Sequence, residues 1–313
     1  MSSAEIKVFG GTAHPQLLQE ICAYLGIEAG AVRVERFSDG EVYIQVLENV
    51  RGADVFVVQP TNPPAETLLE LLLLIDAFRR SSAARITAVI PYYGYARQER
   101  KDKPRVPISA KLIADLIEAA GVHRILTMDL HAPAIQGFFS VPVDHLFAGP
   151  VLIEYLENLG VVDPVIVSPD AGGVERARFY SKRTGGSLAI IDKRRTGPNV
   201  AESVNVIGDV EGRDCVIVDD IIDTAGTVSG AVRALLQSGA RSVRGCFTHP
   251  VLSGRAIERL NDSEVSGIAV CNTIPLSDHQ LSCKKIEVLS VAPLLGEAIR
   301  RTHTNSSISS LFV

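Results

Sequence analysis

Two adjacent aspartates, Asp219 and Asp220, directly follow the apolar run 216–218, and a turn of small and hydroxyl residues, 223–227, comes next. At a strand-to-helix turn such residues let backbone N–H groups point into one concavity, and the helix N-terminus adds partial positive charge, so phosphate binds there. Carboxylates repel phosphate, so the aspartates suit sugar hydroxyls or a hydrated metal ion. The pattern predicts a sugar phosphate lying along 219–227. An ordinary capped helix is the alternative, but it explains one polar residue and not the adjacent pair.

Basic side chains gather in two other loops, each placed after a predicted strand. The first loop is 97–105, and the second holds Lys193, Arg194 and Arg195. A lysine point charge and an arginine fork are what a dispersed phosphoryl charge needs, and Lys193 and Arg195 could supply them. The alternative is a solvated basic turn, which is the usual interpretation of an isolated Lys-Arg-Arg.

Short β-branched runs alternate with helical stretches and must position these side chains. Strands are expected at 55–58, 86–90, 125–128, 165–167, 188–191, 216–218 and 243–247. Helices are expected from Asn62 (cap) and Pro63 (first residue) to about Arg80, and over 109–119, 173–182 and 227–237. Such an alternation of apolar strands with helices predicts an α/β fold with parallel sheets covered on both faces. Segment 41–46 alternates polar and apolar residues, which predicts an edge antiparallel strand.

The same succession occurs in both halves of the chain. In each half a strand (55–58 or 165–167) leads through a helix to a second strand (86–90 or 188–191), and a basic loop follows. Two tandem domains of one fold would produce this pattern, whereas chance similarity between α/β segments is the alternative. We expect the domain boundary near residues 148–150.

Length and composition agree with this organisation. At roughly 150 residues per domain, 313 residues suggest two domains, and 46% hydrophobic residues indicate an ordered globular chain. A formal net charge of −5 argues against nucleic-acid or membrane binding through bulk charge, but leaves small phosphorylated ligands open. The apolar run 71–75 is too short to span a membrane. Residues 1–6 lack signal-peptide features, so we expect a cytoplasmic protein. Five cysteines without C-x-x-C spacing predict reduced, buried thiols.

Residues 216–227 resemble the phosphoribosyl-diphosphate motif of type I phosphoribosyltransferases. Other segments are similar to the ribose-phosphate diphosphokinases, also called phosphoribosyl pyrophosphate synthetases: 37–41, 92–101, 129–131, 168–173 and 192–195. The similarity extends from about Val8 into the tail, 307–312. It implies two tandem type I phosphoribosyltransferase-like domains, each a mainly parallel sheet flanked by helices. The implied parts are an ATP-side domain (1–148), a ribose 5-phosphate-side domain (149–300) and a regulatory or packing tail (301–313).

This resemblance implies a reaction: ATP and ribose 5-phosphate give 5-phosphoribosyl 1-diphosphate (PRPP) and AMP, with Mg²⁺, for nucleotide biosynthesis. Such a transfer depends on positioning and charge neutralisation. Lys193 is implied as the catalytic lysine and Arg195 as a contact of the ribose phosphate or transition state. His131 and Asp170 are implied as metal-binding residues. A hydrogen-bonding structural histidine and a helix N-cap are their respective alternatives.

The resemblance also implies two substrate sites. Ribose 5-phosphate is expected to contact Arg195, Asp219, Asp220, Asp223, Thr224, Ala225, Gly226 and Thr227. ATP is expected to contact Phe37, Asp39, Gly40, Glu41, Arg97, Gln98, Arg100 and Lys101. Phe37 would stack on adenine, and loop 97–101 of a neighbouring subunit would complete the pocket. The alternative for 38–40 is a tight turn before a strand.

Regulation is implied by the phosphate-activated class I members of the family, in which phosphate activates and ADP inhibits at a site between subunits. Ser307 and Ser309 match that site, and Arg51 is a candidate contributor; a frayed terminus is the alternative for the serines. The family usually forms homohexamers.

One residue departs from the family pattern, because Ala225 stands where many members have glycine. A methyl group is tolerable there unless the position needs a positive φ. Two other functions stay open. A phosphoribosyltransferase would use PRPP at the same loop, and a non-catalytic regulatory homologue would be expected to lack Lys193, Arg195 or Asp219, all of which are present.

Overall fold

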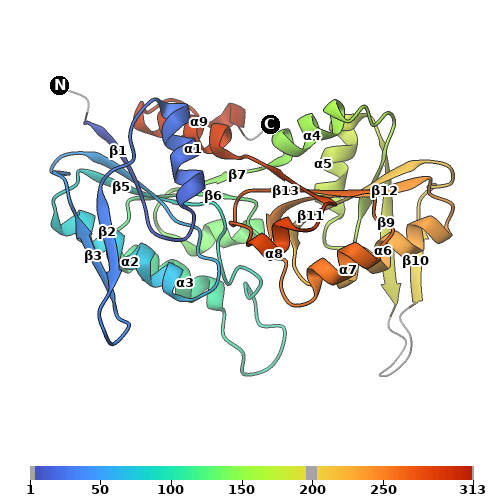
Figure 1. Ribbon diagram of the computed structural model, residues 1–313, viewed down its shortest axis with the longest axis horizontal. Helices are drawn as coiled ribbons and strands as arrows, with labels where there is room; N and C mark the ends of the chain where they lie inside the picture. Colours follow the sequence, from blue (N-terminus) through green and yellow to red (C-terminus); the bar gives the residue numbers. More distant parts are fainter. Residues whose placement is uncertain (1–3, 195–202, 312–313) are drawn as a thin grey trace. The chain divides into compact units, whose positions relative to one another are not determined.

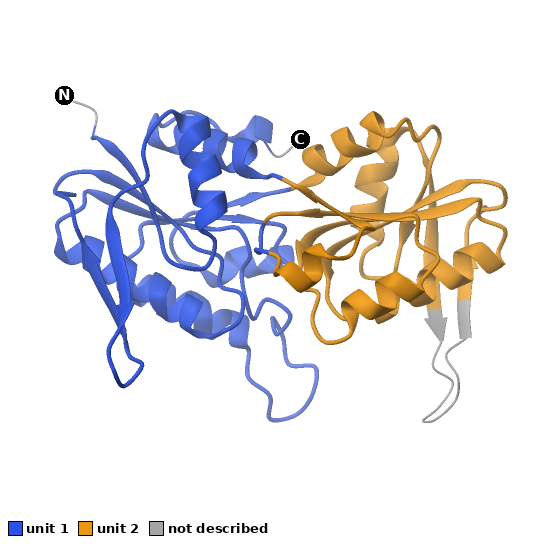
Figure 2. Ribbon diagram, in the orientation of Figure 1, with its two compact units in different colours: residues 1–147, 273–275, 290–313 blue, residues 148–272, 276–289 orange. Residues whose placement is uncertain are grey.

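The computed structural model describes residues 4–194 and 203–311. The chain forms two compact units (Figure 2). Unit 1 consists of residues 1–147, 273–275 and 290–313, and unit 2 consists of residues 148–272 and 276–289. Each unit has its own buried apolar cluster, so each is a separate α/β body as the sequence predicts.

Unit 1 is built on a sheet of five parallel strands in the order β1-β4-β5-β6-β7. These strands are β1 (Ile6–Gly10), β4 (Asp54–Val58), β5 (Arg85–Ile90), β6 (Arg124–Met128) and β7 (Val143–Leu146). Every residue of β4 is buried. A strand buried on both faces requires a near-continuous apolar sequence, which explains why these strands were predicted correctly.

Helices cover both faces of the unit 1 sheet, with α1 and α9 on one face and α2 and α3 on the other (Figure 1). The helices of this unit are α1 (Pro15–Leu25), α2 (Glu66–Arg80), α3 (Ser109–Ala120), α9 (Ala292–His303) and the 3₁₀ turns η1 (Pro133–Phe138) and η2 (Ser309–Leu311). In α2, Leu71, Leu74 and Phe78 recur at helical spacing and are fully buried. The apolar stripe thus fixes which face of α2 meets the sheet.

A two-stranded antiparallel sheet projects from unit 1. It pairs β2 (Val32–Arg36) with β3 (Val42–Val46). Ile44 and Val46 of β3 pack on the unit 1 core. The predicted antiparallel strand over 41–46 is therefore confirmed, and its wet face is the one that carries Gln45.

Unit 2 holds a seven-stranded sheet in the order β10-β9-β8-β11-β12-β13-β14, parallel except for β10. Its strands are β8 (Val165–Ser168), β9 (Ser187–Arg194), β10 (Ser203–Ile207), β11 (Asp214–Ile222), β12 (Ser242–Pro250), β13 (Gly267–Cys271) and β14 (Ile286–Leu289). Its helices are α4 (Gly149–Asn158), α5 (Val174–Thr184), α6 (Gly226–Gln237), α7 (Ala256–Asp262) and α8 (Asp278–Leu281). Figure 1 shows α4 and α5 on one face of this sheet, and α6 and α7 on the other.

The sheet orders show how the two units correspond. Strands β1, β4, β5, β6 and β7 are neighbours in chain order, and so are β8, β11, β12, β13 and β14. In each unit a strand pair, β2–β3 or β9–β10, interrupts this run after the helix that follows its first strand. The predicted match of 55–58 with 165–167 is therefore wrong by one strand: β4 corresponds to β11, and β8 corresponds to β1. Hydrophobic runs look alike, so only the pairing partners reveal the correct match.

The start of α2 also differs from the prediction. The helix begins at Glu66 with Ala65 at the cap, and Asn62 makes no capping bond to it. A residue before proline is driven away from the helical region, so Pro63 cannot open a helix when Pro64 follows it. The carbonyls of Asn62 and Pro64 instead accept hydrogen bonds from the Thr67 hydroxyl.

The C-terminal segment 290–313 belongs to unit 1, whereas the sequence analysis assigned residues up to 300 to the second domain. Helix α9 packs on α1, where the Tyr24 ring lies against Gly296 so closely that a Cβ there would be 2.5 Å from it. The Asp54 carboxylate accepts a hydrogen bond from the Arg85 guanidinium, and it lies 2.8 Å from the His303 ring nitrogen Nδ1. These contacts explain why the end of the chain returns to unit 1.

The sequence analysis also predicted reduced cysteines and argued against a membrane-spanning segment. All five cysteines are buried and none forms a disulfide, which confirms the interpretation as structural thiols. Within the two described stretches, no helix is long and apolar enough to cross a membrane.

Candidate active site

The order of strands in unit 2 reverses at β8 and β11. From β8 the chain goes to β9 on one side, and then returns to place β11 on the other side. In open α/β sheets, ligands bind in the crevice beyond the carboxyl ends of strands at such a switch point. Asp170 follows β8, and Asp219 and Asp220 lie near the carboxyl end of β11, so the predicted acidic residues come together at this edge.

The two aspartates lie within β11 and not in a loop after it. Pairing of β11 with β8 ends at Ile217↔Val167, while pairing with β12 continues to Ile222↔Pro250. The apolar signal stops at Val218, but the strand continues because β12 supplies backbone partners. The acidic pair is therefore held by a rigid strand, and only residues 223–225 form the turn.

A cation that the sequence analysis missed forms ion pairs with both aspartates. Arg176 in the first turns of α5 forms an ion pair with Asp219, and its Nη1 lies 3.2 Å from Oδ1 of Asp220. Asp220 is buried, and its backbone N–H donates to Oδ1 of Asp219 at 2.9 Å. Because several residues of its helix are charged, the sequence pattern predicts that Arg176 is a solvent-exposed residue. Its position just after the Gly172-Gly173 connection from β8 was the available signal.

Electrostatics at the acidic pair favour a neutralising ligand. Burial, followed by the adjacent Asp220 carboxylate, raises the pKa of Asp219 to about 7, while the Arg176 guanidinium offsets part of the rise. Two carboxylates side by side resist ionising together, so hydroxyl donors or a cation would stabilise their ionised form.

The sequence analysis noted that alanine is tolerable at position 225 unless the backbone there needs a positive φ, and the turn after β11 does need one. Ala225 is the cap of α6 and has φ = 57°, ψ = 6°, in the left-handed region. This conformation costs a non-glycine residue about 1–2 kcal/mol. The position does need a positive φ, so the alanine stores strain directly at the start of α6, where phosphate-binding N–H groups are expected.

Asp170 has the geometry of a helix N-cap, which was the alternative to a metal-binding role. Its Oδ1 accepts hydrogen bonds from the N–H groups of Gly172 (2.9 Å) and Gly173 (3.0 Å), just before α5. Asp170 is nevertheless exposed. Because both bonds use Oδ1, Oδ2 can face a ligand, so this geometry is compatible with a metal role that stays a prediction.

Lys193 is the penultimate residue of β9 and lies opposite Val204 of β10 in the antiparallel register. Arg195 lies outside the described residues. The β9–β10 pair holds the same place in unit 2 as the β2–β3 hairpin holds in unit 1. Lys193 and the expected adenine segment, 37–41, thus belong to equivalent strand pairs.

The expected adenine residues form the β2–β3 turn. The Phe37 side chain is 54% exposed and meets the Tyr43 ring edge-on at 5.4 Å between centroids. Asp39 accepts a hydrogen bond from the N–H of Glu41 at 3.0 Å, and Gly40 has φ = 96°. The tight turn that was the alternative is present, and it leaves an exposed aromatic face for a planar ligand.

The basic loop of unit 1 follows β5 and precedes α3. Gln98 accepts a hydrogen bond from the Ser109 hydroxyl, and its backbone carbonyl receives the N–H of Ala110 at 3.3 Å. Arg100 is exposed and lies 3.4 Å from the Glu99 carboxylate, and Lys101 is also exposed. Gln98 is thus tied to α3, whereas the charges beyond it face solvent. The positive-φ residue Tyr95 begins this turn.

His131 follows β6 and is exposed, at the carboxyl end of the unit 1 sheet. Buried His145 nearby has a structural role, because its Nε2 accepts a hydrogen bond from the N–H of Leu130 at 2.8 Å. The role of His131, as a contact of Mg²⁺ and ATP or as a hydrogen-bonding structural histidine, stays a prediction.

The unit 2 sheet edge offers carboxylate oxygens to a metal ion. In the parts of the chain that the structure describes, no three His, Cys, Asp or Glu side chains gather in a metal-binding cluster. Mg²⁺ keeps several waters and takes one or two carboxylates together with substrate phosphates. The exposed Asp170 carboxylate is compatible with such a contact, which stays a prediction.

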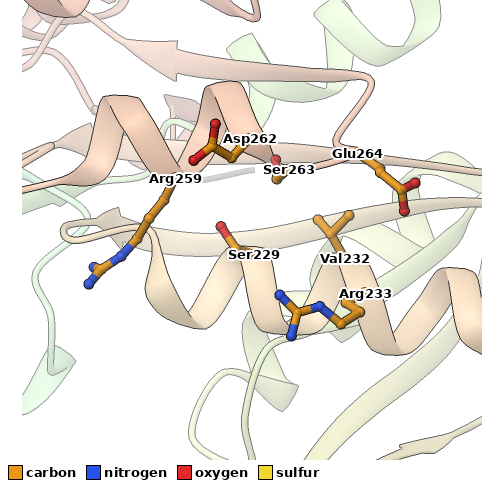
Figure 3. A pocket seen from close by; sticks show the side chains of 7 residues that line it. All are labelled: Ser229, Val232, Arg233, Arg259, Asp262, Ser263 and Glu264. Atoms are coloured by element: carbon orange, nitrogen blue, oxygen red, sulfur yellow. The ribbon is translucent and has the colours of Figure 1, made fainter.

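A cavity of about 430 Å³ lies beside the phosphate turn, between α6 and α7. Figure 3 shows its lining side chains, which are Ser229, Val232, Arg233, Arg259, Asp262, Ser263 and Glu264. The hydroxyl oxygen of Ser229 is buried there without a hydrogen-bond partner. The sequence analysis did not single out these residues, because they carry charges of both signs at ordinary helix spacing.

The expected regulatory serines lie on the returning tail of unit 1. Ser307 and Ser309 are exposed, and their hydroxyls are 3.1 Å apart. Arg301 donates to the backbone carbonyl of Ser307 at 3.1 Å. Arg51 is exposed at the turn before β4. The described part of the tail is therefore held by contacts of its own.

The switch-point aspartates and the strained turn define the chain as an α/β enzyme of the phosphoribosyltransferase-like class. Comparison with known proteins narrows the class. The family model for the N-terminal domain of ribose phosphate pyrophosphokinase matches residues 6–121, and that for the phosphoribosyl synthetase-associated domain matches residues 193–313. The chain belongs to the ribose-phosphate pyrophosphokinase family and is a diphosphotransferase.

Similarity extends over the whole chain. The ribose-phosphate pyrophosphokinase of Chlorobaculum tepidum is 51% identical over 308 residues, covering 98% of this chain and 95% of that protein. The enzyme of Caldanaerobacter subterraneus is 54% identical over 310 residues, covering 98% of each chain. The crystal structure of phosphoribosylpyrophosphate synthetase from Mycobacterium smegmatis matches with a TM-score of 0.91 and 42% identity, covering 96% of this chain and 100% of that one. The predicted fold class and family are thereby confirmed.

Proposed function

We propose that this enzyme transfers the diphosphoryl group of ATP to the C1 hydroxyl of ribose 5-phosphate. The C1 oxygen bonds to the β-phosphorus, the bond from that phosphorus to the oxygen bridging to the α-phosphorus breaks, and AMP leaves. The hydroxyl proton is released, and the product is PRPP. The observation that carries this proposal is the acidic pair before a phosphate-type turn, Asp219 to Ala225, in a chain that matches the family over its length.

The acidic pair and the turn divide the binding of ribose 5-phosphate between them. Asp219 and Asp220 accept hydrogen bonds from ribose hydroxyls, and the α6 N-terminus with Thr224 and Thr227 receives the 5-phosphate. Arg176 offsets part of the charge of the pair before the sugar arrives. The carboxylates and the phosphate turn are held several residues apart on one strand and its connection, which matches an extended sugar phosphate.

In this proposal Lys193 and Arg195 neutralise the charge on the transferring phosphates, and Mg²⁺ is the cofactor. When bound, Mg²⁺ supplies neutralisation of the phosphate charge. Asp170 and His131 are its proposed protein contacts, and the two residues follow β8 and β6 at carboxyl ends of their sheets. Lys193 presents a compact charge to the β-phosphate, and Arg195 stabilises the ribose phosphate or the transition state.

In this proposal the adenine base of ATP binds at the β2–β3 turn. Exposed Phe37 stacks on adenine, and the carboxylates of Asp39 and Glu41 accept from its amino group. Residues of segment 97–101 contact the phosphates as a basic loop that excludes water. In this proposal the loop comes from a neighbouring subunit of a hexamer.

Regulation is proposed to follow the phosphate-activated class I pattern. Phosphate activates and ADP inhibits at a site that includes Ser307, Ser309 and Arg51. Support comes from the order of the tail, where Arg301 holds the Ser307 carbonyl and the two serine hydroxyls lie together. Paired hydroxyls beside an arginine suit a small anion.

The direct test is to incubate the purified protein with Mg²⁺, ATP and ribose 5-phosphate, and to follow AMP and PRPP across phosphate concentrations. Both products should appear in equal amounts. Folded protein that yields no AMP at any phosphate concentration would refute the proposal. Lys193→Ala should lose turnover but keep ribose 5-phosphate binding. The control Lys182→Ala, which removes an exposed lysine of α5, should keep both turnover and ribose 5-phosphate binding.

A further inference from the structure

The phosphate turn is held by the chain segment that follows β12. The backbone carbonyl of Ile222 accepts a hydrogen bond from the N–H of Leu252 at 3.0 Å. The carboxylate of the next residue, Asp223, accepts one from the Ser253 hydroxyl. Successive residues at the end of β11 are thus bonded to successive residues of the β12–α7 connection.

Arg259 of α7 extends this series to the next residue of the turn. Its Nη1 donates to the backbone carbonyl of Thr224 at 2.7 Å. The same Nη1 would lie 3.6 Å from a Cβ added to Gly226. The guanidinium therefore reaches across Ala225, the residue with φ = 57°. Such a strained conformation persists only where the surroundings fix it, and Arg259 makes a charge-assisted bond to the carbonyl just before it.

Side-chain packing and the Arg259 bond act on this turn together. Ala225 and Val228 are buried in the unit 2 core, whereas the bond of Arg259 to the Thr224 carbonyl is exposed. Figure 3 shows Arg259 on α7 and Arg233 on α6, both at the cavity of about 430 Å³. Packing thus holds the Ala225 methyl group, and Arg259 fixes the carbonyl just before it.

We infer that Arg259 is a positioning residue for ribose 5-phosphate: it acts through the Thr224 carbonyl to hold the phosphate turn in its binding conformation. The inference rests on the proposed function of that turn. Because the 5-phosphate is remote from the reacting C1 atom, its contacts are made equally in the ground and transition states. Loss of Arg259 should therefore raise KM and leave kcat nearly unchanged.

The test compares Arg259→Ala, Arg259→Lys and the matched control Arg233→Ala. The control removes an arginine from the same cavity that makes no bond to the turn. Arg259→Ala should raise KM for ribose 5-phosphate about fivefold, as expected for one exposed charge-assisted bond. Arg259→Lys should recover part of the loss. KM for ATP and the melting temperature should stay near wild type in all three variants.

The strain argument adds a double-mutant measurement. In an Ala225→Gly background the turn needs less support, so Arg259→Ala should raise KM for ribose 5-phosphate by a smaller factor than it does alone. A KM within twofold of wild type for Arg259→Ala, or equal rises in both KM values with a fall in melting temperature, would overturn the inference. Wild-type turnover reports separately on the proposed function, so the two failures are distinguishable.

Discussion

The β4–α2 connection of unit 1 and the β11–α6 connection of unit 2 occupy equivalent places, but their polar groups are used differently. After β4 comes buried Gln59, whose amide donates to the Glu70 carboxylate at 3.0 Å and packs on the backbone of Gly11. Glu70 also accepts from the hydroxyl of Thr12 at 2.8 Å. In unit 1 the carboxylate is thus satisfied by neighbours within the fold.

In unit 2 two adjacent carboxylates lie at the same edge. Asp219 and Asp220 form ion pairs with the Arg176 guanidinium, and the pKa of Asp219 is raised to about 7 by burial and by Asp220. The comparison teaches that one copy of the fold pairs a carboxylate with neutral hydrogen-bond donors, while the other holds two carboxylates together beside a cation. Titratable groups with a strongly shifted pKa are where a ligand is expected.

The largest expected effect is on turnover, from Asp220→Asn. Replacing this buried carboxylate removes charge-assisted bonds to ribose hydroxyls, so kcat/KM for ribose 5-phosphate should fall about 100-fold. Circular dichroism should show an unchanged fold. Steady-state kinetics with retained activity above one tenth of wild type would place the sugar elsewhere.

Glu70→Gln tests the other side of the comparison. The amide group would face the N–H and O–H donors of Thr12 and the Gln59 amide. A buried donor left unsatisfied costs about 1–3 kcal/mol, so urea unfolding should show a lower free energy of unfolding. KM for ribose 5-phosphate should not change. If it rises as far as in Asp220→Asn, the two connections do not differ as described.

A pH dependence of stability follows from Asp219. Its pKa is raised from 3.8 to about 7 on folding, so between these values the folded chain holds a proton that the unfolded chain has released. The free energy of unfolding from this group is therefore greatest at low pH and falls as pH rises to about 7. Urea unfolding at several pH values should show this fall in wild type and a weaker one in Asp219→Asn. Equal slopes in the two proteins would contradict the assignment.

The smallest expected effect compares the two helix caps. Ala225 before α6 has φ = 57°, and Ala65 before α2 has φ = −59°. Glycine relieves the first position, and the gain exceeds its unfolded-state entropy cost, so Ala225→Gly should stabilise by about 0.5 kcal/mol. Ala65→Gly should destabilise by about 0.5–1 kcal/mol. Chemical denaturation of both variants measures the sign, and a common sign would remove backbone strain as the cause.

Sequence reasoning succeeded where the local pattern determines the structure. The apolar runs 55–58 and 216–218 and the antiparallel segment 41–46 carry their own burial pattern, so fold class and strands could be predicted. The extension of β11 to Ile222 could not, because it depends on pairing with β12. Arg176 was missed for a similar reason, since only the folded arrangement brings α5 to the acidic pair.

The division of unit 1 has a consequence for how the chain is made. Residues 148–272 and 276–289 complete unit 2, but unit 1 needs α9, which is synthesised after them. Until then α1 lacks the helix that packs on it, including Gly296 against the Tyr24 ring. Because domains fold as units during synthesis, the unit whose chain begins first is the one that finishes second.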